Sequence, residues 1–391
     1  MDIKVMDAMF AAIRTVFTPD SALSDTDADL LRRNLNNVYM VSNRSDMAQI
    51  VGYALEKQGL ITQDDEMFSQ FQEKQYIAMI KCEEMCYELD RMRALFEENQ
   101  IDFIPLKGAV IREMYPEPWM RTSSDIDILI HPEDLSRATH LLVKKLGYST
   151  GKESGHDHSF FTPQKVHVEL HFNLMESGVA KSANEILDSV WDYAEKRENV
   201  KHEYELNEGM FYFYQIAHMA KHTEGGGSGM RSFLDLWLIN QRFNNENHER
   251  DGLLATGNLE DFNNHCCAVS NHWFGGSEFP DNVAEKFALF VLNCGTYGSM
   301  ENRIAVLHGD SGGTLTYIKR RICLSKEIMR CQYPILKHHG WLLPFCHIAR
   351  WCKLFSTKMI KKIVKEIKIS RSATDEKVEE MQSFLAEIGL K

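Results

Sequence analysis

Three carboxylates in two short segments have the residue types and the spacing of a divalent-metal site. Asp125 and Asp127 are two positions apart in the run Asp-Ile-Asp-Ile-Leu-Ile. On a strand both side chains project from one face, about 6–7 Å apart along the chain. Like charges this close raise each other's pKa, and a divalent cation removes that cost. Mg²⁺ is commonly held by one or two carboxylates together with substrate phosphates.

Glu169 lies in a second alternating segment, residues 166–172. Four apolar side chains share one face of this predicted strand, and His167, Glu169 and His171 share the other. Glu169 could supply the third carboxylate of the site. Two alternatives stay open for the histidines, a solvated strand face or a zinc site shared with Glu169.

A glycine turn precedes both segments. The β-rich run 101–106 ends at Lys107-Gly108, and residues 109–114 are predicted to form a helix. A strand that ends in glycine and opens a helix offers free backbone amides at the helix N-terminus, where a phosphate can bind. Lys107 at this turn could act as a point charge on such a phosphate.

The order of strand, glycine and helix, then an Asp-x-Asp strand, then a later strand acid, resembles the DNA polymerase β-like nucleotidyltransferase superfamily. More narrowly, the sequence is similar to a bacterial family labelled "uncharacterised nucleotidyltransferase". The similarity covers about residues 75–350 and is strongest over 105–172. It rests on these motifs: Leu106-Lys107-Gly108, Tyr115-Pro116, Arg121, Asp125-Ile126-Asp127, Glu169-Leu170-His171, H-x-x-K-H from His218 to His222, and R-x-x-x-D from Arg231 to Asp235.

The resemblance implies an Mg²⁺-dependent transfer of NMP from an NTP to an unidentified hydroxyl or phosphate acceptor. It implies two ions, Mg²⁺ or alternatively Mn²⁺, held by Asp125, Asp127 and Glu169, with Glu169 also drawing off the acceptor's proton. The residues implied for nucleotide binding are Lys107, Gly108, Arg121 and Ser124. Those implied for the substrate pocket are His171, His218, His222, Arg231 and Asp235.

Other interpretations of these residues stay open. Lys107 could be a surface residue, and Arg121 could be an ordinary ion-pair partner of Asp125 or Glu117. His218 and His222 share one helix face but lack the glutamate of an HExxH metalloprotease, so they line a pocket or are structural. The whole protein could also be a non-catalytic nucleotide- or partner-binding relative, or a two-metal phosphodiester hydrolase.

The predicted helices and strands that position these residues indicate an α+β protein, in which a small mixed sheet is embedded between helical segments. Residues 1–98 are predicted to be an N-terminal helical region and 99–178 the nucleotidyltransferase core. Residues 179–310 form a helical domain on the substrate and nucleotide side, and 311–391 a basic C-terminal helical region that includes a helix at 355–369. The glycine-rich stretch 225–229 is expected to be a loop, and a lid is one role for it.

Composition and charge limit the classes of binding partner and the location that the sequence predicts. The net charge of −12 argues against a duplex-DNA binder, yet residues 319–368 hold thirteen Lys/Arg and two acids. This basic window suggests an anionic partner, RNA or a membrane surface, with a solvated helix face as the alternative. Nine cysteines without a CxxC pair, and an N-terminus unlike a signal peptide, predict reduced thiols and a cytoplasmic location.

Overall fold

The computed structural model describes residues 2–18, 21–176, 179–243, 246–294, 339–354 and 375–390, with Met329, Tyr333 and Leu336. The predicted helix at 355–369 and most of the basic window 319–368 lie outside the described residues, so the anionic partner stays a prediction. Within the described residues, no helix is long and apolar enough to cross a membrane.

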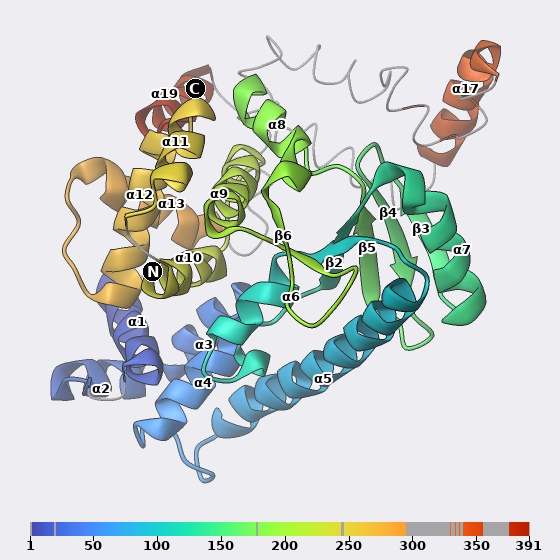
Figure 1. Cartoon of the computed structure of the whole chain (residues 1–391). Coiled ribbons are helices and arrows are strands. Elements are labelled where there is room, and N and C mark those ends of the chain that lie inside the picture. The colour runs from blue at the N-terminus through green and yellow to red at the C-terminus, as the bar shows by residue number, and fades with distance from the viewer. Residues whose placement is uncertain are drawn as a thin grey trace.

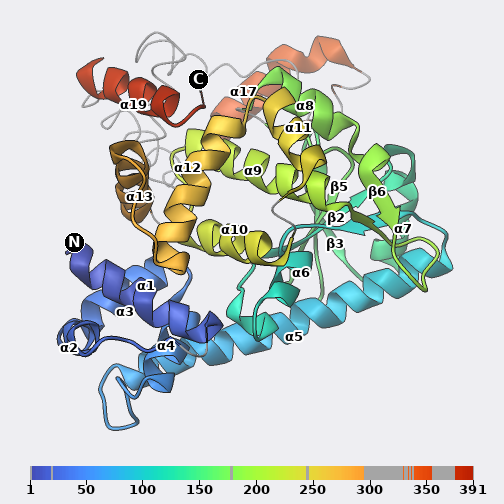
Figure 2. The same ribbon diagram turned by 60° about the vertical axis from the view of Figure 1, so that its left-hand side comes forward.

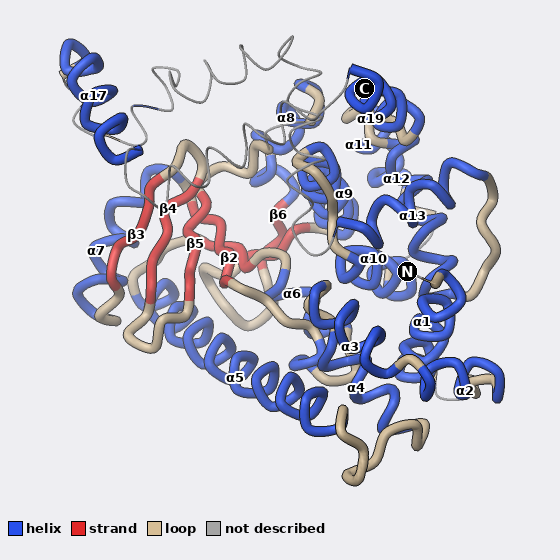
Figure 3. The backbone as a smooth tube through the Cα atoms, turned by 180° about the vertical axis from the view of Figure 1, so that it is seen from behind, coloured by secondary structure: helices blue, strands red, loops and turns tan. Residues whose placement is uncertain are grey.

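A five-stranded mixed sheet carries the predicted site, and it confirms the α+β class with a small sheet between helical segments. Strands β2 and β5 are neighbours and run parallel, whereas every other pair in the sheet is antiparallel. Figure 3 shows these strands side by side with helices around them. In spatial order the strands are β1 (Phe103–Pro105), β2 (Asp125–Ile130), β5 (His167–His171), β4 (Asp157–Phe161) and β3 (Ser149–Glu153).

One face of the sheet is buried because β2 and β5 alternate in the expected way. Ile126, Ile128 and Val168 are almost fully buried, in a hydrophobic cluster with residues of two helices. These helices are the 31-residue α5 (Phe68–Glu98) and α7 (Leu135–Lys145). Figures 1 and 2 show α5 running along this side of the molecule. The polar face of β2 and β5 is therefore left for the site.

The helices before and after the sheet share a second, larger core. The ring of Phe10 in α1 (Ile3–Phe17) stacks on Trp273 at 4.7 Å between centroids. The N-terminal region therefore packs on segments more than 200 residues away, as Figure 2 shows, and the predicted domain boundaries remain predictions. Further α-helices among the described residues are α2 (Asp25–Arg33), α3 (Leu35–Arg44), α4 (Ala48–Lys57), α8 (Lys181–Asp188), α9 (Glu208–Glu224), α10 (Met230–Arg242), α11 (His248–Thr256), α12 (Glu260–Ser270), α13 (Asn282–Cys294), α17 (Leu343–Leu354) and α19 (Asp375–Glu387).

One local expectation needs correction. The predicted helix at 109–114 is a four-residue helix, α6 (Gly108–Ile111), that tightens into a 3₁₀ turn over Arg112–Met114. The sequence analysis also did not predict the β3–β4 hairpin, which lies with α7 in the connection from β2 to β5. Most residues of β3 are exposed, so this strand lacks the apolar alternation by which strands are recognised. A small second sheet pairs β6 (Ala194–Lys196) with β7 (Tyr204–Leu206).

Candidate active site

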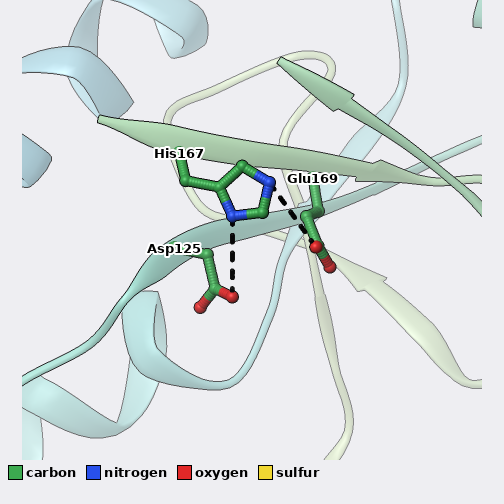
Figure 4. Close-up of side chains that lie close together, drawn as sticks. All are labelled: Asp125, His167 and Glu169. Atoms are coloured by element: carbon green, nitrogen blue, oxygen red, sulfur yellow. Dashed lines mark ion pairs between the residues drawn. The ribbon is translucent and has the colours of Figure 1, made fainter. Parts of the chain in front are cut away.

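The three predicted metal-binding carboxylates lie together on the polar face of β2 and β5. The parallel register places Asp127 opposite Glu169 and Asp125 opposite His167. Ligand atoms of Asp125, His167 and Glu169 lie within 4.8 Å of one another, and so do those of Asp127, Glu169 and His171. Figure 4 shows His167 between two carboxylates, with its Nδ1 4.0 Å from Asp125 and its Nε2 3.6 Å from Glu169. We call these five residues the strand cluster.

Asp127 is the most enclosed member of the strand cluster. One of its carboxylate oxygens, Oδ1, lies 2.7 Å from His171 Nε2 and 3.5 Å from Lys107 Nζ. Burial by itself would raise the pKa of Asp127, but the Lys107 ammonium and the hydrogen bond from His171 hold it well below its usual range. Asp127 is therefore ionised, and His171 donates to it from Nε2.

The other two carboxylates have the opposite electrostatic character. Burial, and after it the charge of Asp127, raises the pKa of both Asp125 and Glu169. Three carboxylates thus face one another with Lys107 as the nearby lysine. Hard oxygen ligands with an excess of negative charge are the donor set that suits Mg²⁺ or Mn²⁺. The residues present therefore fit a divalent ion, which would remove the repulsion that raises these pKa values.

The Gly108 turn lies beside the strand cluster. A Cβ on Gly108 would lie 2.7 Å from Arg121 Nη1, so the close approach of this arginine requires glycine here. Lys107 adopts a positive φ of 43°, which places its ammonium against Asp127 and 5.7 Å from the ring centroid of Tyr214. The expectation of free helix amides is only partly met, because the Ala109 and Val110 amides donate to the carbonyls of Leu106 and Lys107.

Arg121 is buried and bonded to a residue that the sequence did not pair with it. Its Nε and Nη2 donate to the two oxygens of Asp235 at 3.0 and 2.9 Å, and its Nη1 donates to Ser123 Oγ at 2.8 Å. Tyr115 also donates to Asp235. The partner is thus neither Asp125 nor Glu117. All three guanidinium nitrogens of Arg121 are thus engaged within the protein, and its expected role in nucleotide binding stays a prediction.

A second group of ionisable residues involves helix α9. Glu176, which follows β5, lies 2.8 Å from His218 Nδ1 and forms an ion pair with Lys221. His222 Nε2 lies 3.0 Å from His218 Nε2. We call Glu176, His218, Lys221 and His222 the helix cluster. Sequence reasoning found the two histidines but missed Glu176, which lies outside any regular element and carries no periodic signal.

One pocket of about 380 Å³ joins the two clusters. Its lining includes every site residue expected from the sequence: Lys107, Gly108, Arg121, Ser124, Asp125, Asp127, Glu169, His171, His218, His222, Arg231 and Asp235. Residues that the sequence analysis did not select also line it, among them Tyr214 and Glu176. Arg231 bonds outward to Asp46 at 2.6 Å and Thr122 at 2.8 Å, which ties the start of α10 to the turn before α4. The roles of these residues are proposals.

Three carboxylates that cluster on two parallel strands beside a pocket of about 380 Å³ suit metal-assisted transfer or hydrolysis at a phosphate group. The chain belongs to the family described as "uncharacterised nucleotidyltransferase", whose model matches residues 32–275. This confirms the family expected from the motifs, although the match begins and ends earlier than the expected 75–350. No curated protein and no solved structure matches the chain.

Proposed function

We propose that this protein transfers a nucleoside monophosphate from an NTP to an acceptor in a reaction that requires Mg²⁺. One observation carries the proposal: Asp125, Asp127 and Glu169 converge from two parallel strands on a single pocket, in a chain of a nucleotidyltransferase family. Two bound ions would supply charge neutralisation on the attacking and leaving oxygens at the α-phosphate.

The residues of the chain have separate tasks in this proposal. Asp125, Asp127 and Glu169 are the carboxylate ligands, and His171 holds Asp127 ionised and oriented by its 2.7 Å hydrogen bond. Because that bond and Lys107 both engage Oδ1, the second oxygen of Asp127 is the one available as a ligand. Glu169 as the residue that draws off the acceptor's proton stays a prediction, and a second candidate for this role follows below.

The triphosphate is proposed to lie along the Gly108 turn. Lys107 is the cation of this turn, and Asp127, Tyr214 and Glu176 outweigh the effect of burial on its pKa, which is raised. It is therefore always charged and can contact a phosphate oxygen as a point charge. Arg121, held by Asp235, fixes Ser123 and Ser124 at the pocket wall, which makes it a positioning residue.

The test is incubation of the full-length protein with each α-³²P-labelled NTP, Mg²⁺ and a cell extract. We expect label to move from the NTP to an acceptor with the wild type and not with Asp127→Asn. Asp102→Asn is the matched control, because this aspartate pairs with His202 and lies outside the pocket lining. The control is expected to transfer label as the wild type does.

Each alternative predicts a different result in the same assay. Label that appears only as free nucleoside monophosphate would support the phosphodiester hydrolase. NTP that binds without turnover would support the non-catalytic relative. Either result, or transfer that survives in Asp127→Asn, would overturn the proposal.

A further inference from the structure

The helix cluster is a chain of hydrogen bonds that begins at a carboxylate. Burial by itself would raise the pKa of Glu176, but the hydrogen bond from His218, together with Lys221, lowers it to about 2. Glu176 is therefore an ionised carboxylate, which can accept hydrogen bonds but not donate them. The contact of 2.8 Å between His218 Nδ1 and Glu176 thus requires the hydrogen to lie on Nδ1.

That assignment fixes the direction of the next bond. Burial, and after it the charge of Lys107, lowers the pKa of His218 to about 3, so the ring is neutral at pH 7. A neutral imidazole with hydrogen on Nδ1 has a lone pair on Nε2. His222 Nε2, 3.0 Å away, must then be the donor. The hydrogen bonds run from His222 to His218 to Glu176.

This series of hydrogen bonds ends at His222 Nδ1, whose lone pair has no partner among the described residues. Burial, and after it Lys221, lowers the pKa of His222 to about 4, so this ring is also neutral and its Nδ1 is unprotonated. Among the described residues this Nδ1 has no hydrogen-bond partner, and it is not one of the buried polar atoms sealed without one. His222 lines the pocket, so the lone pair is open to a ligand.

We propose that His222 Nδ1 accepts the hydrogen of the acceptor's nucleophilic group, so that the acceptor is an alcohol and not a phosphate. This inference rests on the proposed nucleotidyl transfer. An alcohol presents a hydrogen to a lone pair, whereas the nucleophilic oxygen of an ionised phosphate has none and would meet the lone pair with negative charge. The acceptor class is thus a hydroxyl compound, such as a sugar or a hydroxyl side chain.

The reaction balances with His222 as the proton acceptor. The alcohol oxygen forms a bond to the α-phosphorus, and the bond from the α-phosphorus to the bridging oxygen breaks. Pyrophosphate leaves with that electron pair, and the hydroxyl proton passes to His222 Nδ1. The positive charge that develops on His222 is stabilised by the Glu176 carboxylate through His218, as an orienting acid stabilises a histidine in a catalytic triad.

The first test reads the hydrogen positions directly and does not depend on any activity. Long-range ¹H–¹⁵N NMR spectra of the ¹⁵N-histidine-labelled full chain at pH 7 report the tautomer of each ring. Signals are assigned with His218→Gln and His222→Gln. We expect His218 to be neutral with hydrogen on Nδ1 and His222 to be neutral with hydrogen on Nε2. A charged ring or the opposite tautomer at either position would overturn the inference.

The second test determines the linkage in the product and the separate contributions of the Nδ1 and Nε2 atoms of His222. In the labelling assay with α-³²P-NTP and cell extract, ³¹P NMR of the purified product distinguishes a phosphodiester from a pyrophosphate linkage. We expect a phosphodiester. His222→Gln, which keeps a polar atom near His218 but removes Nδ1, should lower the label-incorporation rate at least about 100-fold. His222→Asn keeps an amide oxygen near the Nδ1 position and should recover part of that loss.

Bound α-³²P-NTP, measured by filter binding, should be the same in these variants as in the wild type. His202→Gln is the control for removing a histidine, because His202 pairs with Asp102 away from the pocket lining. A pyrophosphate-linked product, or equal rates in His222→Gln and the wild type, would overturn the hydroxyl inference and leave nucleotidyl transfer standing. Absence of label transfer in the wild type contradicts the proposed function instead, and the NMR result is unaffected by it.

Discussion

The strand cluster and the helix cluster share one pocket and similar residue types, yet the pKa values of their carboxylates shift in opposite directions. In the strand cluster three carboxylates face one another, and the pKa values of Asp125 and Glu169 are raised. In the helix cluster a single carboxylate, Glu176, is bonded to His218 and Lys221, and its pKa is lowered. The negative charge of the strand cluster therefore exceeds the positive charge near it, whereas the charge of Glu176 in the helix cluster is compensated within the protein.

This difference indicates that the strand cluster, and not the helix cluster, is the part of the pocket that a cation would stabilise. A group of like charges that the fold leaves uncompensated is where a cation contributes most binding energy. A compensated carboxylate instead holds its neighbours in one protonation state, which is what orienting groups do. The pocket therefore divides into a cation-binding side on the sheet and a proton-handling side on α9.

The largest expected effect comes from making the same substitution in both clusters. Glu169→Gln should lower label transfer by at least about 10³-fold, because it removes charge stabilisation at the reacting phosphate. Its free energy of unfolding should not fall, since the substitution relieves repulsion. Glu176→Gln should cost about 10–100-fold in transfer and also about 2 kcal/mol of stability, because it leaves the partly buried Lys221 and His218 without their acid. Urea denaturation and the labelling assay measure both. Equal stability loss in the two variants would contradict the comparison.

The next effect concerns the pair that fixes the pocket wall. Asp235→Asn should lower the free energy of unfolding by about 3–5 kcal/mol, because Arg121 and Asp235 are both buried and bidentate. Asp46→Asn removes an exposed partner of Arg231 and should cost no more than about 1 kcal/mol. The measurement is urea denaturation of both variants. A cost for Asp235→Asn as small as that for Asp46→Asn would show that Arg121 is held by something else.

These pairs also show how much the sequence could predict. The alternation of residues 125–130 and 166–172 correctly predicted two strands with their acids on one face, and the motifs predicted the family. Periodicity describes a single segment, so it could not reveal that β2 and β5 are parallel neighbours in the register that pairs Asp127 with Glu169.

Contacts distant in sequence were beyond prediction for the same reason. Arg121 and Asp235 are 114 positions apart, and Glu176 and His218 are 42 apart. Only the folded chain chooses among the 56 acids that could pair with a given cation. Tyr214 was not selected either, because it lies on a helix whose residues are mostly buried and gives no sign of facing a pocket.

A moderate effect should appear in the pH dependence of stability. The pKa values of His218 and His222 are lowered to about 3 and about 4 in the folded chain, from an ordinary 6.5. The unfolded chain therefore takes up protons first as the pH falls. The stability that these histidines contribute is complete above about pH 6.5 and is lost progressively below it. Urea denaturation from about pH 7.5 to 5 should show a steeper decline for the wild type than for the His218→Gln/His222→Gln double variant. Parallel slopes would mean that the two rings are not held neutral.

The smallest effect tests a third region, on the far side of the Gly108 turn. Arg112 is buried, donates from Nε to the Gly108 carbonyl at 2.8 Å, and lies 3.7 Å from Cys86 Sγ. The hydrogen bond from Cys82 and the charge of Arg112 lower the pKa of Cys86 to about 6, against the effect of burial. Iodoacetamide near pH 7 should label Cys86 about 10-fold faster than Cys267, whose pKa burial raises. Mass spectrometry gives both rates. Arg112→Met should reduce the difference, and equal rates in the wild type would refute the thiolate.

The most direct test of the cation-binding side is calorimetric titration of a non-hydrolysable NTP analogue into the full-length protein, with and without Mg²⁺. The wild type should bind the analogue with Mg²⁺ and lose most of this affinity without it, and Asp127→Asn should fail to bind under either condition. Binding of equal affinity with and without Mg²⁺, or unchanged binding in Asp127→Asn, would contradict the assignment of Asp125, Asp127 and Glu169 as the metal-binding carboxylates.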